Sequence, residues 1–239
     1  MKILTIWVWA FWLATLNHLS KTHKNTTFYA YEKDQKSVDF MKKNWENPYF
    51  FTWEKLQKNI ELIENINELL PSIDLIIIAI PNQFVRSMIK EIKPYLKNWV
   101  SFLNLSKWID NLNLKTVSDN LSEELAWLEY HYNALSWWMI ANELFYWKEL
   151  WAQIWYSDEQ TWLKIKELFE TESLKIDLTP DYKNIELFWA LKNVLAIYTW
   201  YLEWKWEEYS SIWYHLCELL KDIEKIIIEI GRASCRERV

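Results

Sequence analysis

The sequence predicts an α/β fold in which a doubly wound parallel sheet is followed by the start of an all-α C-terminal domain. Segments of strand and helix character alternate through the first two-thirds of the chain, which is typical of βαβ units. Residues 74–80, DLIIIAI, are apolar from Leu75 onward, as in a strand that is buried on both faces of a parallel sheet. From Asp181 onward only the helical spacing of apolar residues remains.

The individual elements follow in chain order. A β-branched run over residues 2–6 predicts the first strand, the apolar spacing of residues 10–20 predicts the first helix, and residues 27–31 form the second strand. The later predicted strands are residues 74–80, 100–105, 129–135, 152–157 and 174–178, and the later helices are residues 82–96 and 158–170. With a boundary near Pro180, we expect residues 1–180 to form the α/β domain and residues 181–228 to begin the helical domain.

Glycine and tryptophan are inverted in abundance. The chain has 19 Trp and 1 Gly in 239 residues, whereas glycine makes up about 7% of an average protein. Several tryptophans stand where glycine is expected, such as Trp99, which follows Asn98 between a predicted helix and a predicted strand. We interpret most of them as glycines, because the codon UGA is read as tryptophan under some genetic codes and as glycine under others. Trp162 is a candidate for a genuine tryptophan, and the alternative reading of the whole chain is a Trp-rich protein of a membrane interface.

Residues 229–239, EIGRASCRERV, differ in composition from the rest of the chain. They contain the single glycine, three of the four arginines and one of the two cysteines. We expect the natural sequence to stop near Ile228 and this tail to be non-native, so it does not enter the fold prediction.

Charge and cysteine content exclude several classes of protein. The net charge of −6 and the pI of about 5.4 argue against a nucleic-acid partner. Outside the tail only Cys217 remains, so no disulfide framework is predicted, and because the four histidines lack ligand spacing we assign no metal. The apolar stretch of residues 3–16 is too short to span a membrane comfortably. We expect a cytoplasmic protein with no membrane span.

The spacing W-x-W-x-x-W lies between the first predicted strand and the first predicted helix, at Trp7, Trp9 and Trp12. Read as glycines, these residues form G-x-G-x-x-G, the fingerprint of a Rossmann-type dinucleotide-binding domain. In such a turn the second glycine lets the backbone approach a pyrophosphate, and the helix N-terminus binds the phosphates. Glu32 lies about 20 residues further on, where an acidic residue holds the ribose of NAD, whereas Lys33 would tolerate the 2′-phosphate of NADP. The predicted cofactor is NAD or NADP.

Five later segments occur in a characteristic order: ENPYFFTW, AIPNQF, LNLSKWID, LSWWMIANE and ELFWALKNVLAI. With glycine at the tryptophans, they resemble the NAD(P)-dependent glycerol-3-phosphate dehydrogenases over essentially all of residues 1–228. The last segment carries most of the resemblance, because G-A-L-K-N opens the helical substrate domain of that family. The resemblance implies hydride transfer between dihydroxyacetone phosphate and sn-glycerol 3-phosphate, which supplies glycerophospholipid synthesis. It leaves a homodimer open, and the remaining helices of the family's substrate domain are absent.

The resemblance also implies roles for single residues. Lys192 becomes the catalytic lysine, which protonates the developing alkoxide, and Lys107 contacts both cofactor and substrate. The other cofactor contacts that it implies are Ala10, Phe11, Phe84 and Ala141, and the other substrate contacts are Trp137, Met139 and Asn193. Trp138, Met139 and Ile140 depart from the family's S-G-P-[ST]-F-A pattern, which puts a polar contact from Met139 in doubt.

Two further readings remain open from the sequence. The chain resembles, less closely, other two-domain dehydrogenases such as the ketopantoate reductases, but the A-L-K-N segment favours the first family. A dinucleotide-binding protein without catalysis is the other alternative, and the presence of Lys192 argues against it.

Overall fold

The computed structural model describes residues 1–6, 10–106, 109–110, 114–137, 140–178 and 182–236. Within these ranges it leaves out the side chains of residues 136–137, 182–185, 188–189, 192 and 230–236. None of the helices in these ranges combines the length and the apolar character needed to cross a membrane.

An eight-stranded sheet forms the centre of the fold, in the order β3-β2-β1-β4-β5-β6-β7-β8. Ile3 of β1 pairs with Phe28 of β2 on one side and with Leu75 of β4 on the other. The first six strands in the sheet order, β3-β2-β1-β4-β5-β6, are all parallel to one another. The strands are β1 (Ile3–Ile6), β2 (Phe28–Tyr31), β3 (Ile60–Ile63), β4 (Leu75–Ile78), β5 (Val100–Asn104), β6 (Tyr130–Trp137), β7 (Leu150–Tyr156) and β8 (Leu174–Leu178). The predicted fold class, with residues 2–6 beside residues 74–80, is confirmed.

The last two strands run in the opposite direction to the others. β7 pairs antiparallel with β6, with Leu135 opposite Ile154, and β8 is parallel to β7. The helix between β6 and β7, α5 (Ala141–Phe145), is about 8 Å long, whereas β6 spans about 26 Å. A helix this short does not return the chain along the sheet, so β7 comes back antiparallel.

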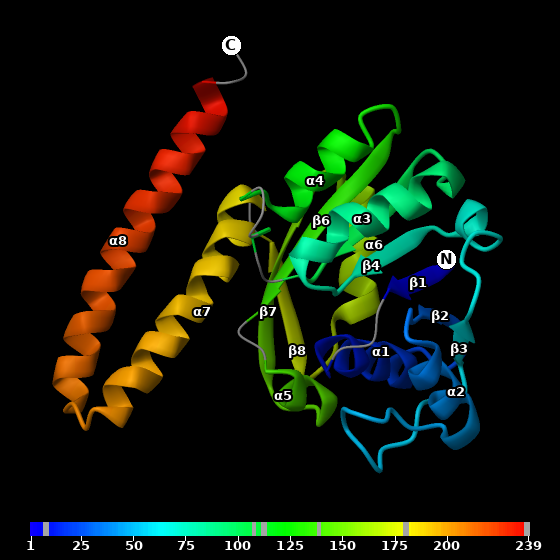
Figure 1. Ribbon diagram of the computed structural model, residues 1–239, viewed down its shortest axis with the longest axis horizontal. Coiled ribbons are helices and arrows are strands. Elements are labelled where there is room, and N and C mark those ends of the chain that lie inside the picture. The colour runs from blue at the N-terminus through cyan, green and yellow to red at the C-terminus, as the bar shows by residue number, and fades with distance from the viewer. Residues whose placement is uncertain (7–9, 107–108, 111–113, 138–139, 179–181, 237–239) are drawn as a thin grey trace.

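Helices cover both faces of the sheet (Figure 1). Because the strand order reverses between β1 and β4, right-handed crossovers place α1 and α2 on one face of the sheet and α3 and α4 on the other. α3 accordingly contacts α4, whereas α5 and α6 contact α1 and therefore lie on its face of the sheet. The remaining helical elements are α1 (Ala10–Thr22), α2 (Gln35–Asn44), η1 (Leu70–Ser72), α3 (Asn82–Ile92), η2 (Lys93–Tyr95), α4 (Val117–Glu124), α6 (Glu159–Phe169), α7 (Tyr182–Trp204) and α8 (Tyr209–Arg236).

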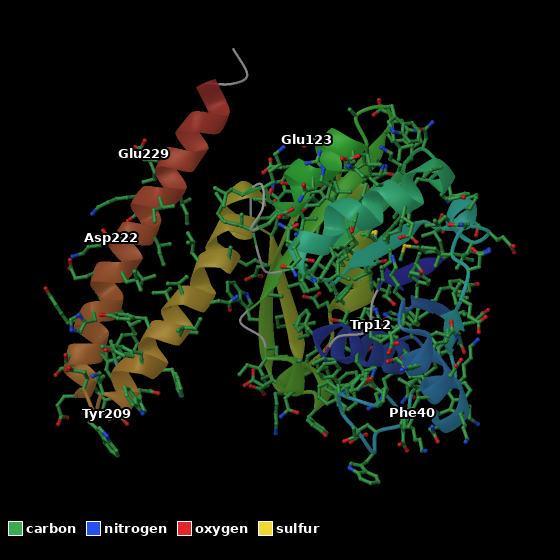
Figure 2. The ribbon with its side chains drawn as sticks, in the orientation of Figure 1. Trp12, Phe40, Glu123, Tyr209, Asp222 and Glu229 are labelled. Atoms are coloured by element: carbon green, nitrogen blue, oxygen red, sulfur yellow. The ribbon has the colours of Figure 1, made fainter. Side chains whose placement is uncertain are left out.

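Two long helices follow β8. α7 packs against β6 and β7, and α8 packs back on α7 (Figure 1). Figure 2 shows Tyr209, Asp222 and Glu229 on α8, on the far side of α7 from the sheet. α8 continues unbroken through Ile228 to Arg236.

Seven described residues other than glycine have a positive φ, and five of them are tryptophans. Trp45 follows α2 with φ 57° and ψ 34°, and its N–H donates to the carbonyl of Met41, as glycine does at a left-handed helix C-terminus. Trp99 has φ 65° in the turn after Asn98. The other three tryptophans with a positive φ are Trp53, Trp147 and Trp206. A bulky side chain in this region is an outlier, so the backbone supports the reading of these positions as glycine.

Trp162 and Trp12 differ in whether their side chains make favourable contacts. Trp162 stacks on Tyr156 with ring centroids 5.7 Å apart, and Lys166 Nζ lies 5.4 Å from its ring centroid, as expected of a genuine tryptophan. Trp12 is buried in α1 (Figure 2), and its Nε1–H has no hydrogen-bond partner among the described atoms. A buried unpaired indole N–H costs free energy, a cost that glycine at position 12 removes.

Trp45→Gly and Trp99→Gly are each expected to raise the free energy of unfolding by about 1 kcal/mol, because glycine adopts a positive φ without the Cβ clash. Trp162→Gly is the matched control. It lies inside α6 and should lower the free energy of unfolding by at least about 1 kcal/mol. Urea unfolding of the three variants measures the effect, and stabilisation by Trp162→Gly with destabilisation by the other two would contradict the glycine reading.

A buried histidine gives α1 a pH-dependent contact. His18 Nε2 lies 3.0 Å from the carbonyl oxygen of Phe169, and burial lowers the pKa of His18 below its ordinary 6.5. Since the folded state resists protonation, the stabilising contribution is present above pH 6.5 and is lost as the pH falls through the folded pKa. We expect the free energy of unfolding to fall by up to about 1.4 kcal/mol per pH unit there. His18→Gln should flatten the profile below pH 6.5, and parallel profiles for parent and variant would contradict this.

Candidate cofactor and active site

A cavity of about 270 Å³ lies at the carboxyl ends of β1, β2 and β4. This is the point where the strand order reverses, which is where open α/β sheets bind their ligands. Its wall is mainly apolar, as expected for a pocket that binds a flat aromatic group. The lining residues are Ile6, Tyr31, Lys33, Ile66, Ile80, Phe84, Ser87, Met88, Glu91 and Ile92.

Charged residues follow β2 at the mouth of this cavity. Glu32 accepts a hydrogen bond from the backbone N–H of Asp34 at 2.8 Å. Lys33 Nζ lies 3.1 Å from Glu91 Oε2, and both side chains are about half exposed. Burial and the charge of Glu91 raise the pKa of Tyr31 above 10. The predicted cofactor residues Lys33 and Phe84 therefore line one cavity, with Glu32 directly beside Lys33 in the chain.

The predicted phosphate-binding turn is described only from its helical side. Trp7 and Trp9 lie outside the described residues. Ala10 begins α1, Phe11 packs against the core, and Trp12 is buried. The N-terminus of α1 thus follows closely on the carboxyl end of β1, where its amide groups and dipole favour a phosphate.

The carboxyl end of β5 is tied to that of β4. Asn104 Oδ1 accepts a hydrogen bond from the backbone N–H of Ser106 at 2.8 Å, and Ser106 Oγ donates to the carbonyl of Ile80 at 2.6 Å. Ile80 also lines the cavity. Lys107 itself lies outside the described residues, but the segment that leads to it is held beside the cavity.

A buried carboxyl group joins α7 to the sheet. Glu186 is 8% exposed and accepts hydrogen bonds from Asn104 Nδ2 at 2.9 Å and from the backbone N–H of Ser118 at 3.3 Å. The hydroxyl groups of Ser118 and Tyr132 also donate to it. Burial raises the pKa of Glu186, and these hydrogen bonds oppose the rise. Burial and the neighbouring carboxyl group raise the pKa of Tyr132 well above 10.

The predicted substrate residues come from three places in the chain. Lys192 lies in α7, but its side chain is outside the description, whereas Asn193 is described and half-buried. Trp137 ends β6 without a described side chain, and Met139 lies outside the described residues. Ala141 begins α5. Their predicted roles stay predictions.

Several site residues were not predicted from the sequence. Phe84, Met88 and Glu91 lie on one face of α3 at helical spacing, a signal that could have placed the last two in the cavity wall. The hydrogen bonds of Glu186 join residues as far as 82 positions apart, which no local pattern reveals. Among the described residues, no three His, Cys, Asp or Glu side chains gather in a way that could hold a metal ion.

The strand order, the helix after β1 and the apolar cavity at the β1–β4 reversal define a dinucleotide-binding domain of the Rossmann type. A family model described as the NAD-dependent glycerol-3-phosphate dehydrogenase N-terminus matches residues 6–159. The chain belongs to this family. The resemblance drawn from the motifs is therefore confirmed, and the family supports NAD or NADP as the cofactor.

Curated relatives and solved structures agree with this assignment. A glycerol-3-phosphate dehydrogenase (NAD(P)+) of Maridesulfovibrio salexigens is 27% identical over 197 residues, which cover 82% of this chain and 59% of the relative. One from Fusobacterium nucleatum is 26% identical, over 79% of this chain and 55% of the relative. The crystal structure of a glycerol-3-phosphate dehydrogenase from Coxiella burnetii has the same fold, with a TM-score of 0.88 at 14% identity over 96% of this chain and 69% of that one. The chain thus spans less than two-thirds of the length of these curated relatives.

Proposed function

We propose that this chain contains the cofactor-binding domain and the first substrate-domain helices of an enzyme that interconverts dihydroxyacetone phosphate and sn-glycerol 3-phosphate. The product would supply the backbone of glycerophospholipids. The observation that carries the proposal is the position of α7. Its buried residue Glu186 contacts Asn104 at the carboxyl end of β5, so the segment Ala190–Asn193 follows within about two helical turns of the ligand-binding edge.

The described residues fit one half of a dinucleotide. The apolar cavity between the end of β2 and α3 suits an adenine ring, and Glu32 stands at the end of β2, where the adenine ribose would lie. Lys33 is already paired with Glu91, and that ion pair would have to open before Lys33 could bind the 2′-phosphate of NADP. The pyrophosphate turn fits the cofactor only with glycine at positions 7, 9 and 12, because the obstruction begins at Cβ.

The chain's own residues would handle charge and protons. When bound, the cofactor supplies or accepts a hydride. As the substrate carbonyl gains negative charge, the ammonium group of Lys192 stabilises that oxygen and donates a proton to it. In the reverse direction Lys192 takes the proton from the hydroxyl group. Lys107, which follows Ser106 in the sequence, would bind the substrate oxygen or phosphate as a second cation.

The test uses two proteins. The glycine chain is residues 1–228 with glycine at every tryptophan except Trp162, and the extended chain continues it with the remaining C-terminal residues of the Maridesulfovibrio salexigens relative. We expect the extended chain to oxidise NADH when dihydroxyacetone phosphate is added. The glycine chain should bind NADH without turnover, because the relative's further helices would complete the substrate site.

Ketopantoate is the control substrate, and NADPH is the control cofactor. Oxidation of NADH with ketopantoate but not with dihydroxyacetone phosphate would overturn the substrate assignment. Turnover by the glycine chain alone would show that residues 1–228 already hold a complete site.

A further inference from the structure

One side chain bridges the two segments that carry the proposed lysines. Asn104 accepts from Ser106, which directly precedes Lys107, and donates to Glu186, which lies six residues before Lys192 in α7. Asn104 is 3% exposed, and its amide group makes both hydrogen bonds with heavy-atom distances below 3 Å. Any movement of α7 relative to the end of β5 must therefore break or bend a buried hydrogen bond.

The hydrogen-bond partners of Glu186 come from three elements. Asn104 belongs to β5, Tyr132 to β6 and Ser118 to the first turn of α4, whose N-terminal amide groups favour a carboxylate. All of these contacts are donors to Glu186, as an ionised carboxyl group requires. The described lysine and arginine side chains form no salt bridge with it.

A second buried glutamate provides the contrast. Glu124 is also 8% exposed, but it is ion-paired with Arg86 and Lys93, and it ties α4 to α3 and η2 on the body of the domain. Burial of a carboxyl group costs free energy whichever partners it has. At Glu186 the directional donors from three elements restrict α7 to one placement. The ion pairs of Glu124 join only α4, α3 and η2 and do not involve α7.

We propose that Asn104 and Glu186 are positioning residues, which set the distance between the Lys107 segment and the Lys192 helix. This inference rests on the proposed function for the roles of the two lysines. The hydrogen-bonded bridge itself can be tested without catalysis. If it holds α7 in place, a change in the bridge will loosen α7 locally and leave the β1–α1 region unchanged.

Backbone hydrogen exchange of the glycine chain is the first measurement. Asn104→Asp keeps an acceptor for Ser106 but places a carboxyl group against Glu186. We expect amides of α7 to exchange on the order of tenfold faster or more, while those of α1 keep their rates. The double variant Asn104→Asp/Glu186→Gln again pairs one amide group with one carboxyl group. The amide group at position 186 now donates to the carboxyl group at position 104, so the variant should recover much of the protection. Glu124→Gln is the matched control and should leave α7 unchanged.

Steady-state kinetics of the extended chain is the second measurement. Asn104→Asp should lower kcat by about 10²-fold with little change in the Kd for NADH, since a displacement of about 1 Å between reacting groups has an effect of this size. The double variant should recover part of kcat. Should Asn104→Asp fail to fold, Tyr132→Phe removes one donor from Glu186 and supplies the same comparison at smaller amplitude.

Unchanged exchange of α7 in Asn104→Asp, or in Tyr132→Phe if that variant replaces it, would overturn the proposal, as would uniformly faster exchange of α1 and α7. No recovery in the double variant would also overturn it. An extended chain without any turnover would instead count against the proposed function, because the exchange result does not depend on it.

Discussion

The triple variant Trp7→Gly, Trp9→Gly and Trp12→Gly is expected to create NADH binding in a chain that otherwise has none. An indole at the second position would stand where the pyrophosphate must meet bare backbone, and the first position needs the dihedral angles of glycine. The side chain of Trp12, in α1, is buried, so glycine there removes a large side chain beside the cofactor turn. Quenching of protein fluorescence or titration calorimetry measures the binding.

A matched triple variant separates this effect from general stabilisation. Trp45→Gly, Trp53→Gly and Trp99→Gly relieve three left-handed tryptophans away from the turn, and should stabilise the chain without creating NADH binding. Micromolar binding of NADH by the chain with all its tryptophans would refute the glycine reading. Inspection of the codons gives an independent check, since UGG at these positions would also refute it.

Lys192→Ala in the extended chain is expected to lower kcat by about 10²- to 10⁴-fold, because it removes the proton donor to the alkoxide. The Kd for NADH should change little, since the predicted cofactor contacts lie in the first domain. Stopped-flow mixing and equilibrium titration measure the two quantities separately.

Lys205→Ala is the control for charge on the same part of the chain. Lys205 directly follows α7 and is exposed. Lys205→Ala should leave both kcat and the Kd for NADH unchanged. If Lys192→Ala weakened NADH binding as much as it slowed turnover, Lys192 would be a cofactor ligand and not the proton donor.

The strands of the sheet were predictable because burial on both faces leaves a local record. Residues 75–78 are buried without exception, and their apolar run marks them in the sequence. The predicted bounds of β1, β2, β5 and β8 agree with the structure to within one residue. The elements that were not predicted are short or lie at the surface: α2, β3, η1, α4 and α5. β3 is an edge strand with one fully buried residue, Ile60, so its apolar pattern is weak.

The direction of β7 could not be read from its residues. Parallel and antiparallel strands of this length have similar patterns, and the direction depends on how the chain returns from β6. The site divides in the same way. Glu32 and Lys33 were predicted from their distance after the predicted phosphate-binding turn, and Phe84 was predicted from the family resemblance. The bond between Asn104 and Glu186 depends on tertiary structure alone.

The tryptophans with a positive φ make correct synthesis of this protein depend on the genetic code of its own cell. Five backbone positions with φ between 56° and 79° call for glycine, and under our reading each is written with a codon that most organisms use as a stop signal. A ribosome in such an organism would release the chain after Ile6, before the first turn is complete. Under this reading, only a cell whose tRNA reads UGA as glycine makes the chain with glycine at these positions.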